Sequence, residues 1–230
     1  LDKAYILFKK AYKINKNFSK TLINIGNYLS LKDRNLFAIK AYKKALLYEP
    51  KNTEIYSNIS IAYARTKDFD NAKKYYDKAI INKALNPSLD LSLFYLYMYK
   101  NQYDKAWSLF ESRKGTPKFL RSKNKSIIGQ TVKAEKATII DKKILVVREQ
   151  GIGEEILFSS MYKELINLNN NVKIETDKRL INIFKRSFKS DKFVPDGYYS
   201  KNKDKLASFD SVFFAGSLCS YFRKSKDDFL

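Results

Sequence analysis

The residues best suited to chemistry lie in the stretch Ile144–Ser160, which reads ILVVREQGIGEEILFSS. An apolar run is followed by a polar break, then by Gly151 and Gly153, two carboxylates and a new apolar pattern. This order predicts a strand, a tight glycine turn and the start of a helix. A helix that begins after glycines exposes unpaired backbone N–H groups and the positive end of its dipole. The turn is therefore suited to an anionic ligand.

The glycine turn does not match the better-known phosphate-binding motifs. No Gly-Lys-Ser/Thr follows it, which excludes a P-loop, and Ile156 stands where a dinucleotide fingerprint has its third glycine. A plain strand–helix turn without a ligand therefore remains an alternative. The chain has no histidine and a single cysteine, Cys219, which excludes histidine-based catalysis, an intramolecular disulfide and a cysteine metal cluster. Any catalysis must use carboxylates, Lys, Tyr or Ser.

Alternating helices and strands are predicted around this turn. After the first strand, the apolar patterns predict a helix over 154–168, a strand over 172–175, a helix over 178–188, a short strand over 192–194 and a strand over 211–214. Such alternation predicts a parallel sheet joined by right-handed crossovers. Gly151–Gly153 and Ala215–Ser217 both fall at carboxyl ends of strands, where ligands bind in sheets of this kind.

An internal repeat occupies the first half of the chain. Ala38, Tyr42 and Ala45 recur 34 residues later as Ala72, Tyr76 and Ala79, and Ala106 and Phe110 continue the series. Small residues let two antiparallel helices cross closely and an aromatic fills the wedge between repeats, so the pattern resembles the tetratricopeptide repeat. We predict a half repeat over 1–18, repeats over 19–52, 53–86 and 87–120, a wrapping connector over 121–141 with β-prone pieces at 127–129 and 138–140, and an α/β part over 142–230.

The third repeat departs from the pattern, and its predicted groove differs too. Phe94 stands where a small residue is usual, and Arg113 replaces the last alanine, which indicates a terminal repeat adapted to the segment after it. Asn24 and Asn58 share one position on the first helices, 34 residues apart, while the third repeat has Ser92 there. In repeats that resemble those of O-linked N-acetylglucosamine transferases, asparagines at this position bind a peptide backbone. Solvated polar residues on a helix surface are the alternative.

The whole arrangement resembles bacterial tetratricopeptide-repeat proteins with a glycosyltransferase-like domain of the two-Rossmann (GT-B) type. The residues that carry the resemblance are Gly129, Lys143–Val147, the string Glu149–Phe158 with its Glu-Gln-Gly-x-Gly turn, Phe209-Asp210 and Ser217-Leu218. The implied fold is a tetratricopeptide helical solenoid followed by a partial Rossmann-like parallel α/β domain, the N-terminal half of GT-B. The chain would then be a fragment that is inactive alone.

The resemblance also implies roles for individual residues. In related heptosyltransferase-type enzymes a carboxylate at a comparable turn acts as general base, which implies that role for Glu154. The family usually has Asp there, one methylene shorter. Gly151 and Gly153 would allow close approach of the ligand, Glu149 and Gln150 would shape the turn or touch the ligand, and Ser217 would contribute from the last strand end. The donor would be a nucleotide sugar, bound as substrate with no cofactor or metal.

The predicted function is transfer of a sugar to a protein or glycan acceptor held in the solenoid groove. The alternative is a non-catalytic interaction adaptor with a degenerate glycosyltransferase fold. The net charge of +21 could attract nucleic acid, but the lysines are scattered along the chain, so nucleic acid is not expected as a partner. No apolar run reaches the roughly 20 residues of a membrane span and no secretory signal is visible, so we expect a cytoplasmic protein.

Overall fold

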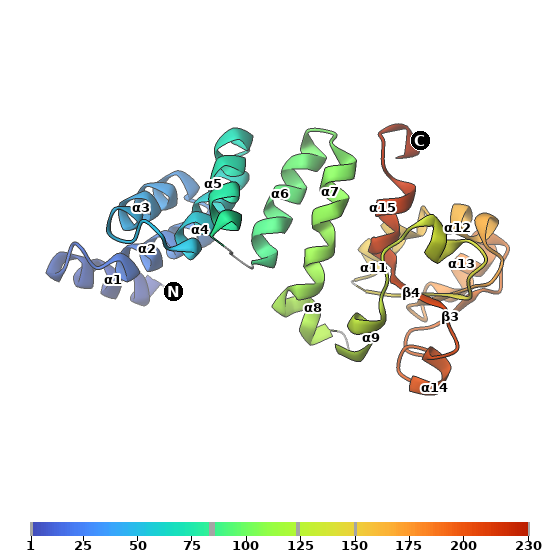
Figure 1. Ribbon diagram of the computed structural model, residues 1–230. Helices are drawn as coiled ribbons and strands as arrows, with labels where there is room; N and C mark the ends of the chain where they lie inside the picture. Colours follow the sequence, from blue (N-terminus) through green and yellow to red (C-terminus); the bar gives the residue numbers. More distant parts are fainter. Residues whose placement is uncertain (1, 83–85, 123–124, 150, 230) are drawn as a thin grey trace. The chain divides into compact units, whose positions relative to one another are not determined.

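The computed structural model describes residues 2–82, 86–122, 125–149 and 151–229, without the side chains of residues 118, 121, 122, 125 and 126 (Figure 1). The chain divides into two compact units, Leu1–Arg113 and Lys114–Leu230. In the described part of the chain, every helix is too short or too polar to cross a lipid bilayer.

The first unit is a series of antiparallel helix pairs. Its helices are α1 (Asp2–Ile14), α2 (Ser19–Leu31), α3 (Asn35–Tyr48), α4 (Thr53–Arg65), α5 (Phe69–Ile81), α6 (Pro87–Tyr99) and α7 (Tyr103–Phe110). The first helices of the pairs begin at residues 19, 53 and 87 and the second at 35, 69 and 103, so the 34-residue period is confirmed. The alanines of the pattern are buried; Ala38, Ala45, Ala72 and Ala79 are all 0% exposed.

Local signals recur with the same period. Asp33, Lys67 and Asn101, 34 residues apart, have φ of 55°, 60° and 56° and reverse the chain between the two helices of each pair. Asn52 and Asn86 precede α4 and α6 and accept hydrogen bonds from backbone N–H groups of the first turn. Left-handed residues end helices and asparagine caps begin them, so these positions define where each repeat turns.

Aromatic packing closes the third helix pair. Phe94, at the position of a small residue, lies 5.4 Å from the ring centroid of Trp107 and 4.8 Å from that of Phe110. Helix α7 ends at Phe110 and continues as the 3-10 turn η1 (Glu111–Gly115). The buried Arg113 replaces the expected alanine and donates to the carbonyl of Phe110 at 3.1 Å. Large side chains at both positions force this pair to pack differently from the earlier ones.

The second unit is a parallel α/β structure. Its strands are β1 (Ile144–Val147), β2 (Val172–Thr176), β3 (Phe193–Pro195) and β4 (Ser211–Phe214), in the order β3-β2-β1-β4, and every pair is parallel. Its helices are α8 (Pro117–Ser122), α9 (Lys125–Gln130), α10 (Lys136–Ile139), α11 (Ile152–Ser159), α12 (Tyr162–Leu168), α13 (Ile181–Phe188), α14 (Lys203–Leu206) and α15 (Cys219–Phe222), with 3-10 turns η2 (Ala215–Leu218) and η3 (Asp227–Phe229). The predicted parallel sheet is confirmed.

The sheet is buried on both faces. Leu145 and Val147 pack with Phe119, Ile127, Leu206, Val212 and Phe214 on one face. Val146, Ile174 and Phe193 are register partners across β1, β2 and β3, so they share the opposite face, and all three are at most 2% exposed. Burial on both faces explains why β1 reads as a continuous apolar run instead of an alternating one.

Two secondary-structure predictions were wrong. The β-prone pieces at 127–129 and 138–140 belong to short helices, α9 and α10, because Ile127 and Ile139 are buried as members of helical turns. The single helix predicted over 154–168 is broken into α11 and α12. Its break coincides with Ser160, whose carbonyl accepts a hydrogen bond from Arg223 at 3.0 Å. These differences depend on contacts that the local pattern does not contain.

Candidate functional site

The candidate site of the second unit lies at the carboxyl ends of β1 and β4. The chain runs from β1 outward to β2 and β3 and then returns to β4 on the other side of β1. The loops after β1 and β4 therefore diverge, which makes this the topological switch point where ligands bind in such sheets. Val147 and Phe214 are partners at the ends of the two strands, so the glycine turn and η2 begin from adjacent points.

Glu149 joins the two loops. Its side chain is 5% exposed, and its Oε1 accepts a hydrogen bond from the backbone N–H of Gly216 in η2. A buried backbone donor without an acceptor is costly, and a carboxylate is a strong acceptor. The structure therefore makes Glu149 an internal clamp of the switch point. Gln150, the next residue, lies outside the described residues.

The two glycines of the turn are exposed, and neither is required by the backbone or by packing. Gly151 precedes α11 in an extended conformation, with φ of −76° and ψ of 176°. A Cβ on Gly153 would meet nothing within 4 Å, and one on Gly151 would meet only Oε2 of Glu154 at 3.0 Å. The space above the turn is therefore open, as a ligand approaching the N-terminus of α11 would require.

The two neighbouring glutamates of the turn differ in environment. Glu155 is 3% exposed; it accepts from the N–H of Asp177 at 2.9 Å and from the Thr176 hydroxyl. Glu154 is half-buried above Gly151 and, among the described residues, forms no hydrogen bond or ion pair. Of these two carboxylates, only Glu154 is therefore available to an incoming group.

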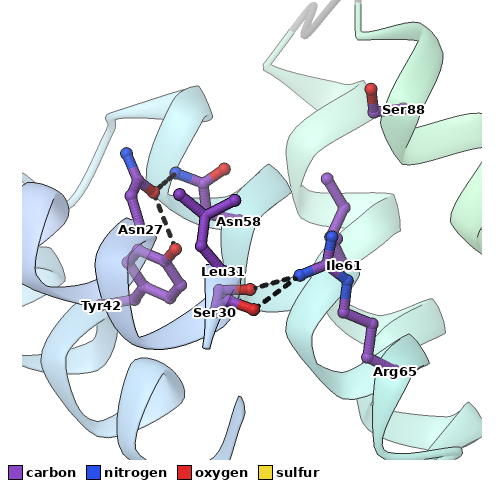
Figure 2. Close-up of a pocket in the computed structure, with 8 residues that line it drawn as sticks. All are labelled: Asn27, Ser30, Leu31, Tyr42, Asn58, Ile61, Arg65 and Ser88. Atoms are coloured by element: carbon purple, nitrogen blue, oxygen red, sulfur yellow. Dashed lines mark hydrogen bonds between the residues drawn. The ribbon is translucent and has the colours of Figure 1, made fainter. Parts of the chain in front are cut away.

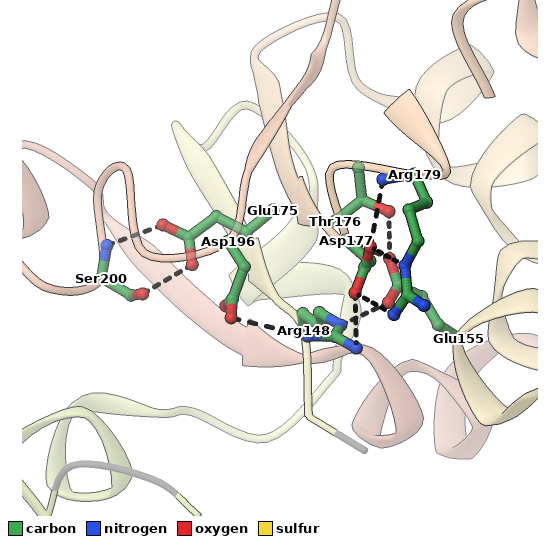
Figure 3. A network of polar contacts seen from close by, with 8 residues as sticks. All are labelled: Arg148, Glu155, Glu175, Thr176, Asp177, Arg179, Asp196 and Ser200. Carbon is green, nitrogen blue, oxygen red and sulfur yellow. Dashed lines mark hydrogen bonds and ion pairs between the residues drawn. The ribbon is translucent and has the colours of Figure 1, made fainter. Parts of the chain in front are cut away.

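Arg148 is the centre of a polar network along the same edge of the sheet (Figure 3). Its guanidinium lies 2.5 Å from Glu155, 3.2 Å from Asp177 and 3.6 Å from Asp196. These residues follow β1, β2 and β3 or begin the next helix, so the network links the strand ends. The sequence analysis missed it, although polar residues directly after predicted parallel strands are a usable signal. Because three carboxylates surround Arg148, its charge is balanced within the fold.

Charge pairing also perturbs Asp177. The Arg179 side chain and backbone N–H both donate to its carboxylate, and together with the charges of Arg179 and Arg148 they hold the pKa of Asp177 well below its usual value. The two Arg179–Asp177 side-chain hydrogen bonds measure 2.8 and 3.0 Å (Figure 3). Asp177 therefore stays ionised through the neutral and mildly acidic range.

Glu175 organises the loop after β3. It is 0% exposed, and its carboxylate accepts from the backbone N–H groups of Tyr199 and Ser200 at 2.7 Å each and from the Ser200 hydroxyl at 2.6 Å (Figure 3). Three donors offset the cost of burying this charge. Ser217, the remaining predicted ligand residue, is 2% exposed in η2, and its carbonyl accepts from Ser220. Its side chain is thus enclosed by the fold.

A groove lines the first helices of the repeats within the first unit. It consists of two adjoining cavities of about 310 and 280 Å³, which share Ile61, Arg65 and Ser88. The first also contains Asn27, Ser30, Leu31, Tyr42 and Asn58, and the second Ala64, Leu91, Ser92 and Tyr95. Asn58 and Ser92 therefore lie in the groove, whereas Asn24 is not among its lining residues.

Asn27, which the sequence analysis missed, takes part instead (Figure 2). Its Oδ1 accepts from the Tyr42 hydroxyl at 2.7 Å and from Nδ2 of Asn58 at 3.3 Å. Asn27 lies three residues after Asn24 on the same helix, so a search of both helical neighbours of Asn24 would have found it. The amide N–H₂ of Asn27 and Oδ1 of Asn58 remain available, which together offer a donor and an acceptor.

Comparison with known proteins gives limited likeness. No family model matches the chain. Protein O-mannosyl-transferase TMTC3 of Homo sapiens is 30% identical over 95 residues, which cover 41% of this chain and 10% of that protein. The chain thus spans about a tenth of that relative. Two crystal structures of MamA align with TM-scores of 0.45 and 0.44 and 21% identity, over 52% of this chain and 70% and 65% of theirs. The first unit is therefore described by its own 34-residue helix pairs as a repeat of tetratricopeptide type.

Proposed function

We propose that this chain takes part in transferring a sugar from a nucleotide-activated donor to a protein or glycan acceptor. The α/β unit would contribute the acceptor side of the reaction, and the groove of the repeats would bind the acceptor. The observation that carries the proposal is the switch point between β1 and β4, where the open glycine turn and the unpartnered Glu154 lie together. The name of the human relative, an O-mannosyl-transferase, agrees in reaction class over the short stretch that matches.

The roles of the residues follow from their environments. Glu154 would remove the proton of the acceptor hydroxyl, because its carboxylate has no competing partner among the described residues. Gly151 and Gly153 would let the acceptor or a donor phosphate approach the N–H groups at the start of α11. Glu149 would hold η2, and with it Ser217, against the turn. No metal or cofactor is included, and the nucleotide sugar is a substrate.

The test uses the protein in its natural full length with UDP-, GDP- and ADP-sugars. Binding is measured by calorimetry, and transfer or hydrolysis by release of the nucleotide. We expect one of the donors to bind and turn over, and Glu154→Gln to lower the rate about 100-fold or more while donor binding persists. Asp191→Asn, at a carboxylate whose side chain is 94% exposed, is the matched control. Absence of both binding and turnover would refute the enzyme proposal, and full activity of Glu154→Gln would refute the role of the base.

The second candidate is a non-catalytic adaptor that binds partner proteins through the repeats. The groove favours it, since amide groups and apolar walls alternate along α2, α4 and α6. Peptide binding by the groove without any binding of nucleotide sugars would support the adaptor over the enzyme.

A further inference from the structure

Arg65 is the one charged residue among the described residues that line the groove. It lies at the end of α4 and belongs to both cavities (Figure 2). Its Nη1 donates to the carbonyl oxygen of Ser30 at 3.1 Å and to the Ser30 hydroxyl at 2.7 Å. Within the described part of the chain it has no carboxylate partner. Arg65 is therefore oriented by α2 but not neutralised, unlike Arg148.

The groove changes in character on either side of Arg65. Towards α2 it is polar, with the free amide atoms of Asn27 and Asn58. Towards α6 it is apolar, lined by Ile61, Leu91 and Tyr95, and Tyr95 is 66% exposed. An extended peptide offers backbone donors and acceptors, which match the amides, and side chains, which can match a cation and an apolar cavity.

We infer that the groove binds an extended segment of a partner protein in which an aspartate or glutamate side chain meets Arg65. A large apolar side chain next to that acid would enter the cavity of Ile61, Leu91 and Tyr95. The segment's backbone would use Asn27 and Asn58. This inference rests on the proposed use of the groove for a protein ligand and does not depend on sugar transfer. The fork of the guanidinium has N–H groups left for a carboxylate after Ser30 is satisfied, and the groove itself supplies none.

The experiment is a selection from random octapeptides displayed at the N-terminus of a phage coat protein. The whole 230-residue chain is immobilised at about 150 mM salt, where exposed charges are screened beyond about 8 Å. Displayed peptides lack a free C-terminal carboxylate, so enrichment reports an internal acidic side chain. We expect enriched peptides to pair Asp or Glu with Leu, Phe, Tyr or Trp within two positions. Enrichment without acidic residues, or no enrichment, would overturn the inference.

Variants assign the preference to Arg65. A selected peptide, labelled with fluorescein, should bind Arg65→Gln about tenfold more weakly by anisotropy, the effect of losing one charge-assisted hydrogen bond. Arg65→Glu should select lysine- or arginine-containing peptides, with helix content checked by circular dichroism. Arg34→Gln removes the same charge from an exposed position outside the groove lining and should bind like the parent. Equal weakening by Arg34→Gln, or displacement by random duplex DNA, would show general attraction of polyanions and overturn the inference.

Failure of this inference and failure of the enzyme proposal are separable. Donor binding and turnover report on the β1–β4 switch point in the second unit, whereas peptide selection reports on residues of α2, α4 and α6 in the first. A chain that turns over nucleotide sugars but shows no acidic preference would keep the transferase proposal alone. A chain with the acidic preference and no sugar chemistry would be an adaptor for acidic, apolar segments.

Discussion

At the scale of single residues, burial determines what polar groups can do. The Tyr162 ring is 0% exposed and lies about 6 Å from the rings of Phe184 and Phe193, with centroid distances of 6.0 Å in both cases. Its hydroxyl has no hydrogen-bond partner among the described residues. Burial is the main cause that raises the pKa of Tyr162 above its usual value, with Glu155 and Glu149 adding to it. The group is therefore neutral and unsatisfied.

The first prediction concerns this hydroxyl. Tyr162→Phe removes only the unsatisfied group and keeps the ring, so the free energy of unfolding should stay unchanged or rise by about 1 kcal/mol. Urea unfolding followed by circular dichroism measures it. Tyr198→Phe, at a tyrosine that is 49% exposed, serves as control and should change stability by less than about 0.5 kcal/mol. A loss above about 1 kcal/mol for Tyr162→Phe would show that the hydroxyl is satisfied, for example by a bound water.

The second prediction concerns Asp177 and pH. Its pKa is lowered in the folded protein, mainly by Arg179, so ionised Asp177 stabilises the fold. That contribution is fully present above the unfolded pKa, about 3.9, and is lost as pH falls below it towards the lowered folded pKa. Asp177→Asn should therefore be less stable than the parent at pH 7, and the difference should shrink below about pH 4.

Urea midpoints measured from pH 7 to pH 2.5 test the Asp177 prediction. Asp191→Asn, at a side chain that is 94% exposed, should follow the parent at every pH. A gap between Asp177→Asn and the parent that widens as pH falls would have the wrong sign and would rule out the ion-pair explanation.

At the scale of elements, helix starts and turns follow the repeat period. Asn52 and Asn86 cap α4 and α6, with Asn52 Oδ1 accepting from Glu54 N–H at 2.9 Å and Asn86 Oδ1 from Ser88 N–H at 3.0 Å. The equivalent residue before α2, 34 positions earlier, is Phe18. It is 52% exposed and forms no side-chain cap. The first described pair therefore lacks a signal that the later pairs possess.

The third prediction restores that cap. Phe18→Asn should raise the free energy of unfolding of the repeats by about 1 kcal/mol, because the amide would satisfy free N–H groups in the first turn of α2. Asn52→Ala is the reciprocal variant and should lower it by a similar amount. Thermal and urea unfolding of both variants would decide the matter. A lower midpoint for Phe18→Asn would mean that the ring contributes more through its contacts than the missing cap costs.

At the scale of the whole molecule, each of the two compact units has a core of its own. The helix pairs of Leu1–Arg113 bury the repeated alanines and aromatics, and the sheet of Lys114–Leu230 buries the strand residues on both faces. Repeats of this kind are stabilised by contacts between neighbours. A unit with its own core is expected to fold when it is separated from the other.

The fourth prediction follows from that division. Leu1–Arg113, produced alone, should give a cooperative urea transition and a circular dichroism spectrum dominated by helix. Phe94→Ala should weaken this fragment by about 3 kcal/mol or more, since the ring packs against Trp107 and Phe110. Tyr99→Ala, at a residue that is 66% exposed, is the control. A fragment without a cooperative transition would show that the repeats need the rest of the chain.

The sequence by itself determined the features that are encoded locally. The 34-residue spacing of small and aromatic residues placed the helix pairs, because close helix crossings require small side chains at fixed intervals. Apolar runs placed β1 and β4, and alternation with helices predicted parallel pairing, because βαβ crossovers bury both faces of a sheet. The glycine turn at 151–153 was located at a strand end for the same reason.

Only the tertiary structure decided which of these residues meet. Glu149 and Gly216 are 67 positions apart, and their hydrogen bond exists because β1 and β4 are neighbours. Arg148 is held by acids from separate loops, and Asn27 replaces Asn24 in the groove because side-chain direction on α2 depends on how the helices pack. Burial of Ile127 and Ile139 turned the expected β-prone pieces into helices. Periodicity is a property of neighbouring residues, whereas pairing between distant groups depends on the packed fold.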